Sequence, residues 1–76
     1  MPHVIVKLYP GRTNEQKKQL ANEIVKDVVA IAKCAEKSVS VAFEEVDQKD
    51  WTEKVYKSDI IEKRENLCIE PGYNPL

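Results

Sequence analysis

The sequence predicts a small α/β (α+β) domain, built as a strand, a long helix and a second strand, with a short helical segment towards the C-terminus. Three observations lead to this fold class. A β-branched run opens the chain at 3–9, apolar residues recur with a helical period over 14–34, and an alternating run follows at 38–46. Because 76 residues suffice for only one domain, residues 1–76 are expected to form a single domain.

The first strand and the long helix are separated by a turn and a helix-start signal. Residues 3–9 are rich in β-branched side chains, and the Pro-Gly pair that follows ends the strand. Thr13 and Gln16 match a capping box, in which the hydroxyl accepts from a helix N–H and the amide reaches back to the cap. The helix is predicted over 14–34. Its apolar stripe consists of Leu20, Ile24, Val28 and Ile31.

The second strand is predicted over 38–46, where apolar and polar side chains alternate. Val39, Val41 and Phe43 point to one face of this strand, and the other face has Ser38, Ser40, Ala42 and Glu44. A strand, a crossover helix and a second strand form a right-handed unit in which the strands are parallel. We therefore expect a two-stranded parallel sheet with the helix on one face.

Beyond the second strand, the sequence predicts a short or broken helix that ends near residue 66. Asp50 and Glu53 match a second capping box, with an aspartate as the cap. The apolar run 67–69 is interpreted as a brief strand, and a tail begins at the Pro-Gly pair after it.

The chain is so short that we expect it to need a second copy of itself for stability. A chain of this size buries only about 60% of the surface that its unfolded form exposes. Cys34 and Cys68 allow at most one bridge and His3 is the only histidine, which argues against a disulfide scaffold or a structural zinc site. Two parallel strands also leave open edges, so we expect a homodimer with a four-stranded sheet.

The charge and hydropathy of the chain exclude two classes of partner. Twelve Lys and Arg against thirteen Asp and Glu give a net charge of −1, without a basic stripe, so no nucleic acid is expected. No apolar run approaches the roughly 20 residues of a membrane span, so no membrane partner is expected. We expect a cytoplasmic protein, with both cysteines reduced and buried as apolar fillers.

The familiar catalytic signatures are absent from the sequence. Gly11 and Gly72 are the only glycines, so there is no glycine-rich phosphate loop, and no serine elbow or zinc-protease helix motif is present. His3 is interpreted as an ordinary residue at the end of a strand. The sequence therefore predicts neither a metal nor a cofactor.

Pro2 is the one candidate for chemistry that the residues alone suggest. Removal of Met1 would leave a secondary amine directly at the start of a strand. Ordinary α-amino groups titrate at about 7.7–8.0, and desolvation or a nearby cation lowers that pKa. A base poised near neutrality suits proton transfer at the carbon beside a carbonyl.

Three segments carry a resemblance to a known family. They are Met1-Pro2 at the start of the first strand, Gly11-Arg12-Thr13 in the turn, and Ser38-Val39-Ser40-Val41 in the second strand. These segments resemble the 4-oxalocrotonate tautomerase family, with which the chain aligns without a gap through residue 51. The length and the C-terminal residues, including Trp51 and Pro71-Gly72-Tyr73, are similar to the longer dimeric branch, the enteric type that acts on phenylenolpyruvate. This similarity implies a homodimer in preference to the hexamer, a trimer of dimers, that shorter relatives form.

The resemblance implies a cofactor-free tautomerase that interconverts the enol and keto forms of a 2-oxoacid. It implies that Pro2 is the general base, that Arg12 holds the substrate carboxylate, and that Trp51 lowers the dielectric constant around the base. Ser40 occupies the substrate-binding position at which the family has a second arginine, which polarises the carbonyl. A monocarboxylate enol such as phenylenolpyruvate therefore fits the chain better than a dicarboxylate.

Strand geometry adds the expectation that the active site is shared between two chains. At about 3.3 Å per residue, the first strand separates Pro2 from the turn by roughly 20–25 Å, so Arg12 cannot reach the Pro2 of its own chain. Trp51 follows the second parallel strand and lies at the same far end, whereas Ser40 lies near Pro2. A two-fold dimer with antiparallel central strands brings Arg12 and Trp51 of one chain beside Pro2 of the other.

Two other interpretations stay open from the sequence. A divergent member of the family keeps the proline base but acts as a hydratase, dehalogenase or decarboxylase. The second alternative is a small oligomeric binding module without catalysis. A blocked N-terminus favours the binding module, because an acylated proline nitrogen is not a base.

Overall fold

The computed structural model describes all 76 residues, which form two compact units, Met1–Glu45 and Val46–Leu76. The first unit consists of strand β1 (His3–Leu8), helix α1 (Asn14–Ala32), the short 3-10 helix η1 (Glu36–Ser38) and strand β2 (Ser40–Glu45). The second unit consists of helix α2 (Gln48–Trp51), the π-helical segment η2 (Thr52–Ile61) and the 3-10 helix η3 (Arg64–Asn66). None of these helices is both long enough and apolar enough to cross a membrane.

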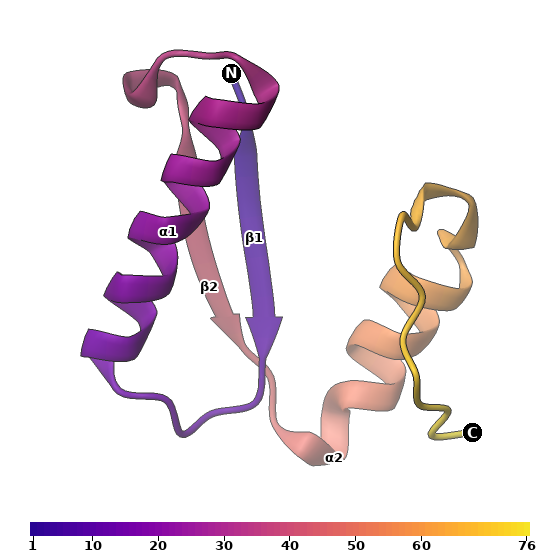
Figure 1. The fold of residues 1–76 in the computed structure, drawn as a ribbon. Coiled ribbons are helices and arrows are strands. Elements are labelled where there is room, and N and C mark those ends of the chain that lie inside the picture. The colour runs from indigo at the N-terminus through magenta and orange to yellow at the C-terminus, as the bar shows by residue number, and fades with distance from the viewer. The chain divides into compact units, whose positions relative to one another are not determined.

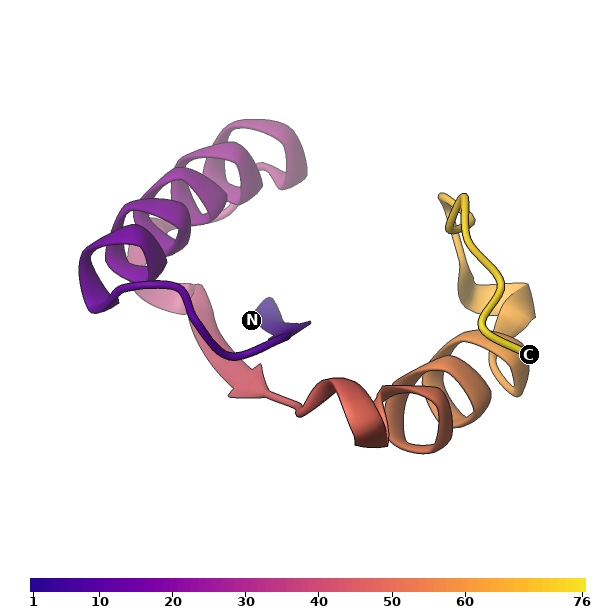
Figure 2. The same cartoon turned by 90° about the horizontal axis from the view of Figure 1, so that it is seen from below.

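The two strands of the first unit pair in parallel, as the sequence predicts, with His3 opposite Ser40 and Leu8 opposite Glu45. Figure 1 shows both arrows pointing the same way and α1 running in the opposite direction beside them. Figure 2 shows α1 on one side of both strands. The sheet therefore has one face that α1 covers and one face that this unit leaves open.

Side chains alternate between these two faces, which confirms the predicted alternation in the second strand. The residues of the covered face are half-buried, namely Val4, Val6, Val41 and Phe43. The exposed residues of the open face are His3, Ile5, Ser40, Ala42 and Glu44. Ile5 is 52% exposed, and no side chain of the first unit is fully buried.

The predicted capping box at the start of α1 is confirmed. The Gln16 N–H donates to the Thr13 hydroxyl at 3.0 Å, and the Thr13 N–H donates to the Gln16 side-chain oxygen at 2.9 Å. The helix ends at Ala32, two residues earlier than predicted, because Lys33 adopts the left-handed conformation with φ of 57°.

The boundaries of both strands are also shorter than predicted. β1 ends at Leu8, and β2 begins at Ser40 because η1 occupies the three positions before Val39. Within η1, the Ser38 hydroxyl donates to the Ala35 carbonyl at 2.7 Å, which holds this residue in the turn instead of the strand.

The helical segment of the second unit starts earlier than the sequence predicts. Asp47, not Asp50, is the cap residue of α2, and its side chain makes no capping hydrogen bond. Asp50 lies inside the helix, so the predicted second capping box is wrong. The helix is broken in character, as predicted, since α2 passes into η2, where the Glu62 N–H donates to the Lys57 carbonyl five residues back at 3.0 Å.

Two predictions for the end of the chain are wrong. The run Leu67–Ile69 forms no strand, and the second unit contains none. The prediction that both cysteines are buried is also wrong. Cys68 in this run is exposed and Cys34 after α1 is only half-buried, and both are free.

The tail of the second unit runs back alongside η2, as Figures 1 and 2 show. The Trp51 indole N–H donates to the Tyr73 hydroxyl at 2.9 Å, and the Tyr56 and Tyr73 rings lie 5.6 Å apart. The buried side chains of the protein all belong to this unit and are Val46, Val55 and Tyr56.

Candidate active site

Pro2 lies at the start of β1 and is half-buried. Its carbonyl accepts a hydrogen bond from the Ser40 backbone N–H at 3.1 Å. This bond extends the parallel ladder by one residue beyond β1, so the backbone of Pro2 is held at the first residue of β2. The strand pairing therefore brings together two of the residues that the sequence singled out, Pro2 and Ser40.

A third residue, His3, joins this end of the sheet. His3 Nδ1 lies 2.6 Å from Ser40 Oγ, and the two residues are register partners in the parallel ladder. Both side chains are exposed on the open face. From the sequence alone, His3 is expected to be an ordinary strand-end residue. Only the register of the two strands, which pairs their first residues, places it against Ser40.

Arg12 lies at the opposite end of β1, in the turn that leads to α1 (Figure 1). The six residues of β1 span roughly 20 Å at about 3.3 Å per residue. Gly11, which directly precedes Arg12, has φ of 126°, a conformation that residues other than glycine rarely adopt. The Arg12 guanidinium donates to the Tyr9 carbonyl at 3.4 Å, so it stays at the turn. The fold therefore separates Arg12 from the Pro2 of its own chain.

Trp51 belongs to the second unit and ends α2. Its indole N–H is bonded to Tyr73, which in turn packs against the buried Tyr56. The sequence singles out Trp51 but does not reveal its hydrogen-bond partner. The tail residue Tyr73 fixes the orientation of the indole, and the separation of 22 residues hides this contact from local patterns.

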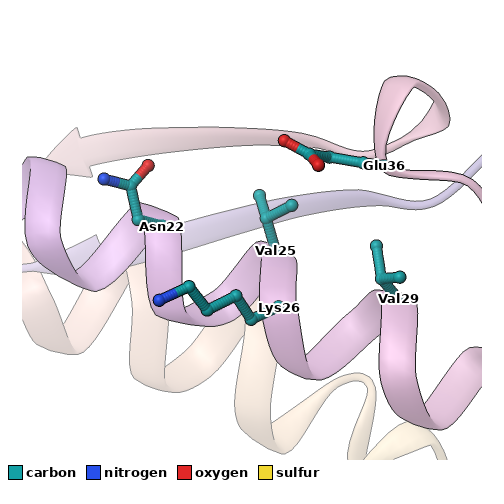
Figure 3. Close-up of a pocket in the computed structure, with 5 residues that line it drawn as sticks. All are labelled: Asn22, Val25, Lys26, Val29 and Glu36. Carbon is teal, nitrogen blue, oxygen red and sulfur yellow. The ribbon is translucent and has the colours of Figure 1, made fainter.

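A surface depression of about 430 Å³ lies elsewhere, between α1 and η1, and is shown in Figure 3. It is lined by Asn22, Val25, Lys26, Val29 and Glu36, none of which is a predicted site residue. No three His, Cys, Asp or Glu side chains come close enough together to hold a metal ion.

Comparison with known proteins decides the family. Residues 2–55 match the sequence family of tautomerase enzymes, which covers both strands, α1 and the start of the second unit. The chain belongs to the tautomerase family. It is an isomerase that acts on a small molecule, and the resemblance to 4-oxalocrotonate tautomerase is confirmed.

Relatives and a solved structure agree with this family. A probable tautomerase of Xylella fastidiosa is 38% identical over 76 residues, which are all of this chain and 93% of the relative. The tautomerase PptA of an Enterobacter species is 39% identical over 75 residues, which are 97% of this chain and 99% of the relative. The crystal structure of YwhB, a homologue of 4-oxalocrotonate tautomerase, superposes with a TM-score of 0.59 at 35% identity. That superposition covers 60% of this chain and 75% of YwhB.

Proposed function

We propose that this tautomerase converts the enol form of a 2-oxoacid into the keto form without a cofactor, with the Pro2 amine as general base. The observation that carries the proposal is the hydrogen bond from the Ser40 N–H to the Pro2 carbonyl. It anchors the residue that bears the amine at the end of a sheet, where once Met1 is removed the nitrogen has a defined position. A base on a flexible terminus would lack that position.

Pro2 transfers one proton from the enol oxygen of the substrate to a carbon of the same molecule. Neutral Pro2 removes the proton of the enol hydroxyl, and the O–H electron pair becomes the second bond of the new carbonyl. The electrons of the carbon–carbon double bond then take the proton back from the prolinium at the adjacent carbon. The amine returns to its neutral form, so one group serves as base and then as acid.

Arg12 binds the substrate carboxylate in this proposal. The chain has two arginines, and Arg64 is paired with Glu70 at 3.0 Å, whereas Arg12 makes only the 3.4 Å bond to the Tyr9 carbonyl. A guanidinium grips a carboxylate through two parallel N–H bonds. With Ser40 at the position of the family's second arginine, one guanidinium per site favours a monocarboxylate such as phenylenolpyruvate.

The active site is proposed to be shared between the two chains of a homodimer in the cytoplasm. Since β1 separates Arg12 from its own Pro2 by the length of a strand, a complete site needs Arg12 and Trp51 of a second copy. The exposed Ile5 on the open sheet face supports pairing of copies, and the two free thiols support a reducing compartment.

The proposed function is tested by intact mass and an ultraviolet assay on phenylenolpyruvate. We expect a mass that lacks Met1 and a rapid conversion of enol to ketone. Pro2→Ala should lower kcat/KM by about 10- to 100-fold, because a primary amine remains as a base with altered basicity and position. A protein with a retained Met1 and full activity would contradict the role of proline. A fully processed protein without activity would favour the binding module.

A further inference from the structure

The side chains of His3 and Ser40 form a hydrogen-bonded pair on the open face of the sheet. The Nδ1 to Oγ distance of 2.6 Å is at the short end for a hydrogen bond, and the two residues are opposite each other in the ladder. Both side chains are exposed, so the pair can meet a bound molecule. The backbone bond from Ser40 to the Pro2 carbonyl ties the pair to the proposed base.

The direction of this hydrogen bond decides what Ser40 can offer a substrate. If His3 Nδ1 carries a hydrogen, it donates to Ser40 Oγ, and the hydroxyl proton remains available for a third group. If Nδ1 is bare, the hydroxyl donates to it and can only accept from a substrate. During tautomerisation the substrate oxygen gains negative charge as its proton leaves, so the useful partner is a donor.

We propose that His3 is a positioning residue that donates through Nδ1 to Ser40 and so presents the Ser40 hydroxyl proton to the enol oxygen of the substrate. This inference rests on the proposed function. A hydroxyl alone is a weaker donor than the arginine it replaces, and a donor behind it polarises the O–H bond. The pair thus supplies the polarisation of the carbonyl, and neither residue takes the proton from the substrate.

The kinetic test uses phenylenolpyruvate and four variants. Ser40→Ala should lower kcat by about 10- to 100-fold with a KM within about threefold, since the lost interaction forms as charge develops. His3→Leu should lower kcat by about 5- to 10-fold, and it should have no further effect in the Ser40→Ala background. His3→Asn retains an amide donor near the place of Nδ1 and should restore kcat to within about threefold of the native value.

Ser38→Ala is the matched control, because it removes a nearby hydroxyl that donates to the Ala35 carbonyl and not to His3. It should leave kcat unchanged. Circular dichroism must show native secondary structure for every variant. A kcat of His3→Leu within twofold of native, or effects of His3→Leu and Ser40→Ala that multiply in the double variant, overturns the proposal.

A second readout needs no activity. His3 is the only histidine, so ring nitrogen signals in a long-range ¹H–¹⁵N spectrum belong to it without assignment. We expect the native protein to carry a hydrogen on Nδ1, and Ser40→Ala to lack it. A bare Nδ1 in the native protein overturns this inference alone. A processed native protein that is inactive on the enol instead overturns the proposed function, and this role of His3 with it.

Discussion

Mixing two variants of low activity tests whether the active site is shared between chains. The perturbation is the pair Pro2→Ala and Arg12→Ala. Loss of a bidentate guanidinium–carboxylate contact should raise KM by about 10- to 100-fold, from the 1.5–3 kcal/mol of a charge-assisted bond. Each variant alone therefore retains about a tenth of native kcat/KM or less. The structure places the two groups at opposite ends of β1.

The magnitude of the recovery follows from two-fold symmetry. Equal amounts of the two variants, once exchanged, give about half heterodimers. Each heterodimer has one site with native Pro2 and native Arg12 and one site that lacks both. About a quarter of all sites are thus complete, so the mixture should recover to about 25% of native activity.

The assay follows phenylenolpyruvate below its KM after incubation under conditions that exchange subunits. Native mass spectrometry must show the heterodimer, and any tag must be at the C-terminal end because Pro2 needs a free amine. The control mixes Pro2→Ala with the double variant Pro2→Ala/Arg12→Ala, in which no site regains proline. Confirmed heterodimers with only the average activity of their parents would refute the shared site.

Three further predictions concern single residues. Thr13→Ala should cost about 0.5–2 kcal/mol, because it removes the hydroxyl that accepts from the Gln16 N–H at 3.0 Å. Calorimetry should then show a Tm lower by roughly 4–8 °C per kcal/mol, and Thr13→Ser should keep most of the stability. Tyr73→Phe should change the fluorescence of Trp51, the only tryptophan, and an unchanged spectrum would contradict its bond to Tyr73. Ser40→Arg should raise the kcat/KM of a dicarboxylate enol relative to phenylenolpyruvate by about 10-fold, and an unchanged ratio would show that this position does not contact the second carboxylate.

Local patterns predicted the first unit well because its signals lie within a few residues. The capping box at Thr13 needs only the residue three positions on, and the alternation in β2 needs only its own side chains. The same kind of signal failed at Asp50, because Asp47 three positions earlier is also a good cap residue and the helix begins there. The apolar run after residue 66 failed as a strand because a strand requires a neighbour, which no local pattern supplies.

In the candidate site too, the sequence predicted what depends on local features and missed what depends on a distant partner. The length of β1 alone separates Pro2 from Arg12, and the sequence was sufficient to predict that. The contact between His3 and Ser40 spans 37 residues and depends on the register of two strands. A shift of that register by one residue would place the two side chains on opposite faces. Register was therefore the missing information.

The open face and the scarcity of buried side chains in the first unit have a consequence for how the enzyme responds to dilution. In that unit even the apolar stripe of α1 is only half-buried at best, and Ile5 is half exposed. When assembly supplies the missing burial, folding and association become one equilibrium, and the melting temperature rises with protein concentration. Total activity would then fall more steeply than the protein concentration. Below a threshold concentration, the enzyme would lose nearly all of its activity.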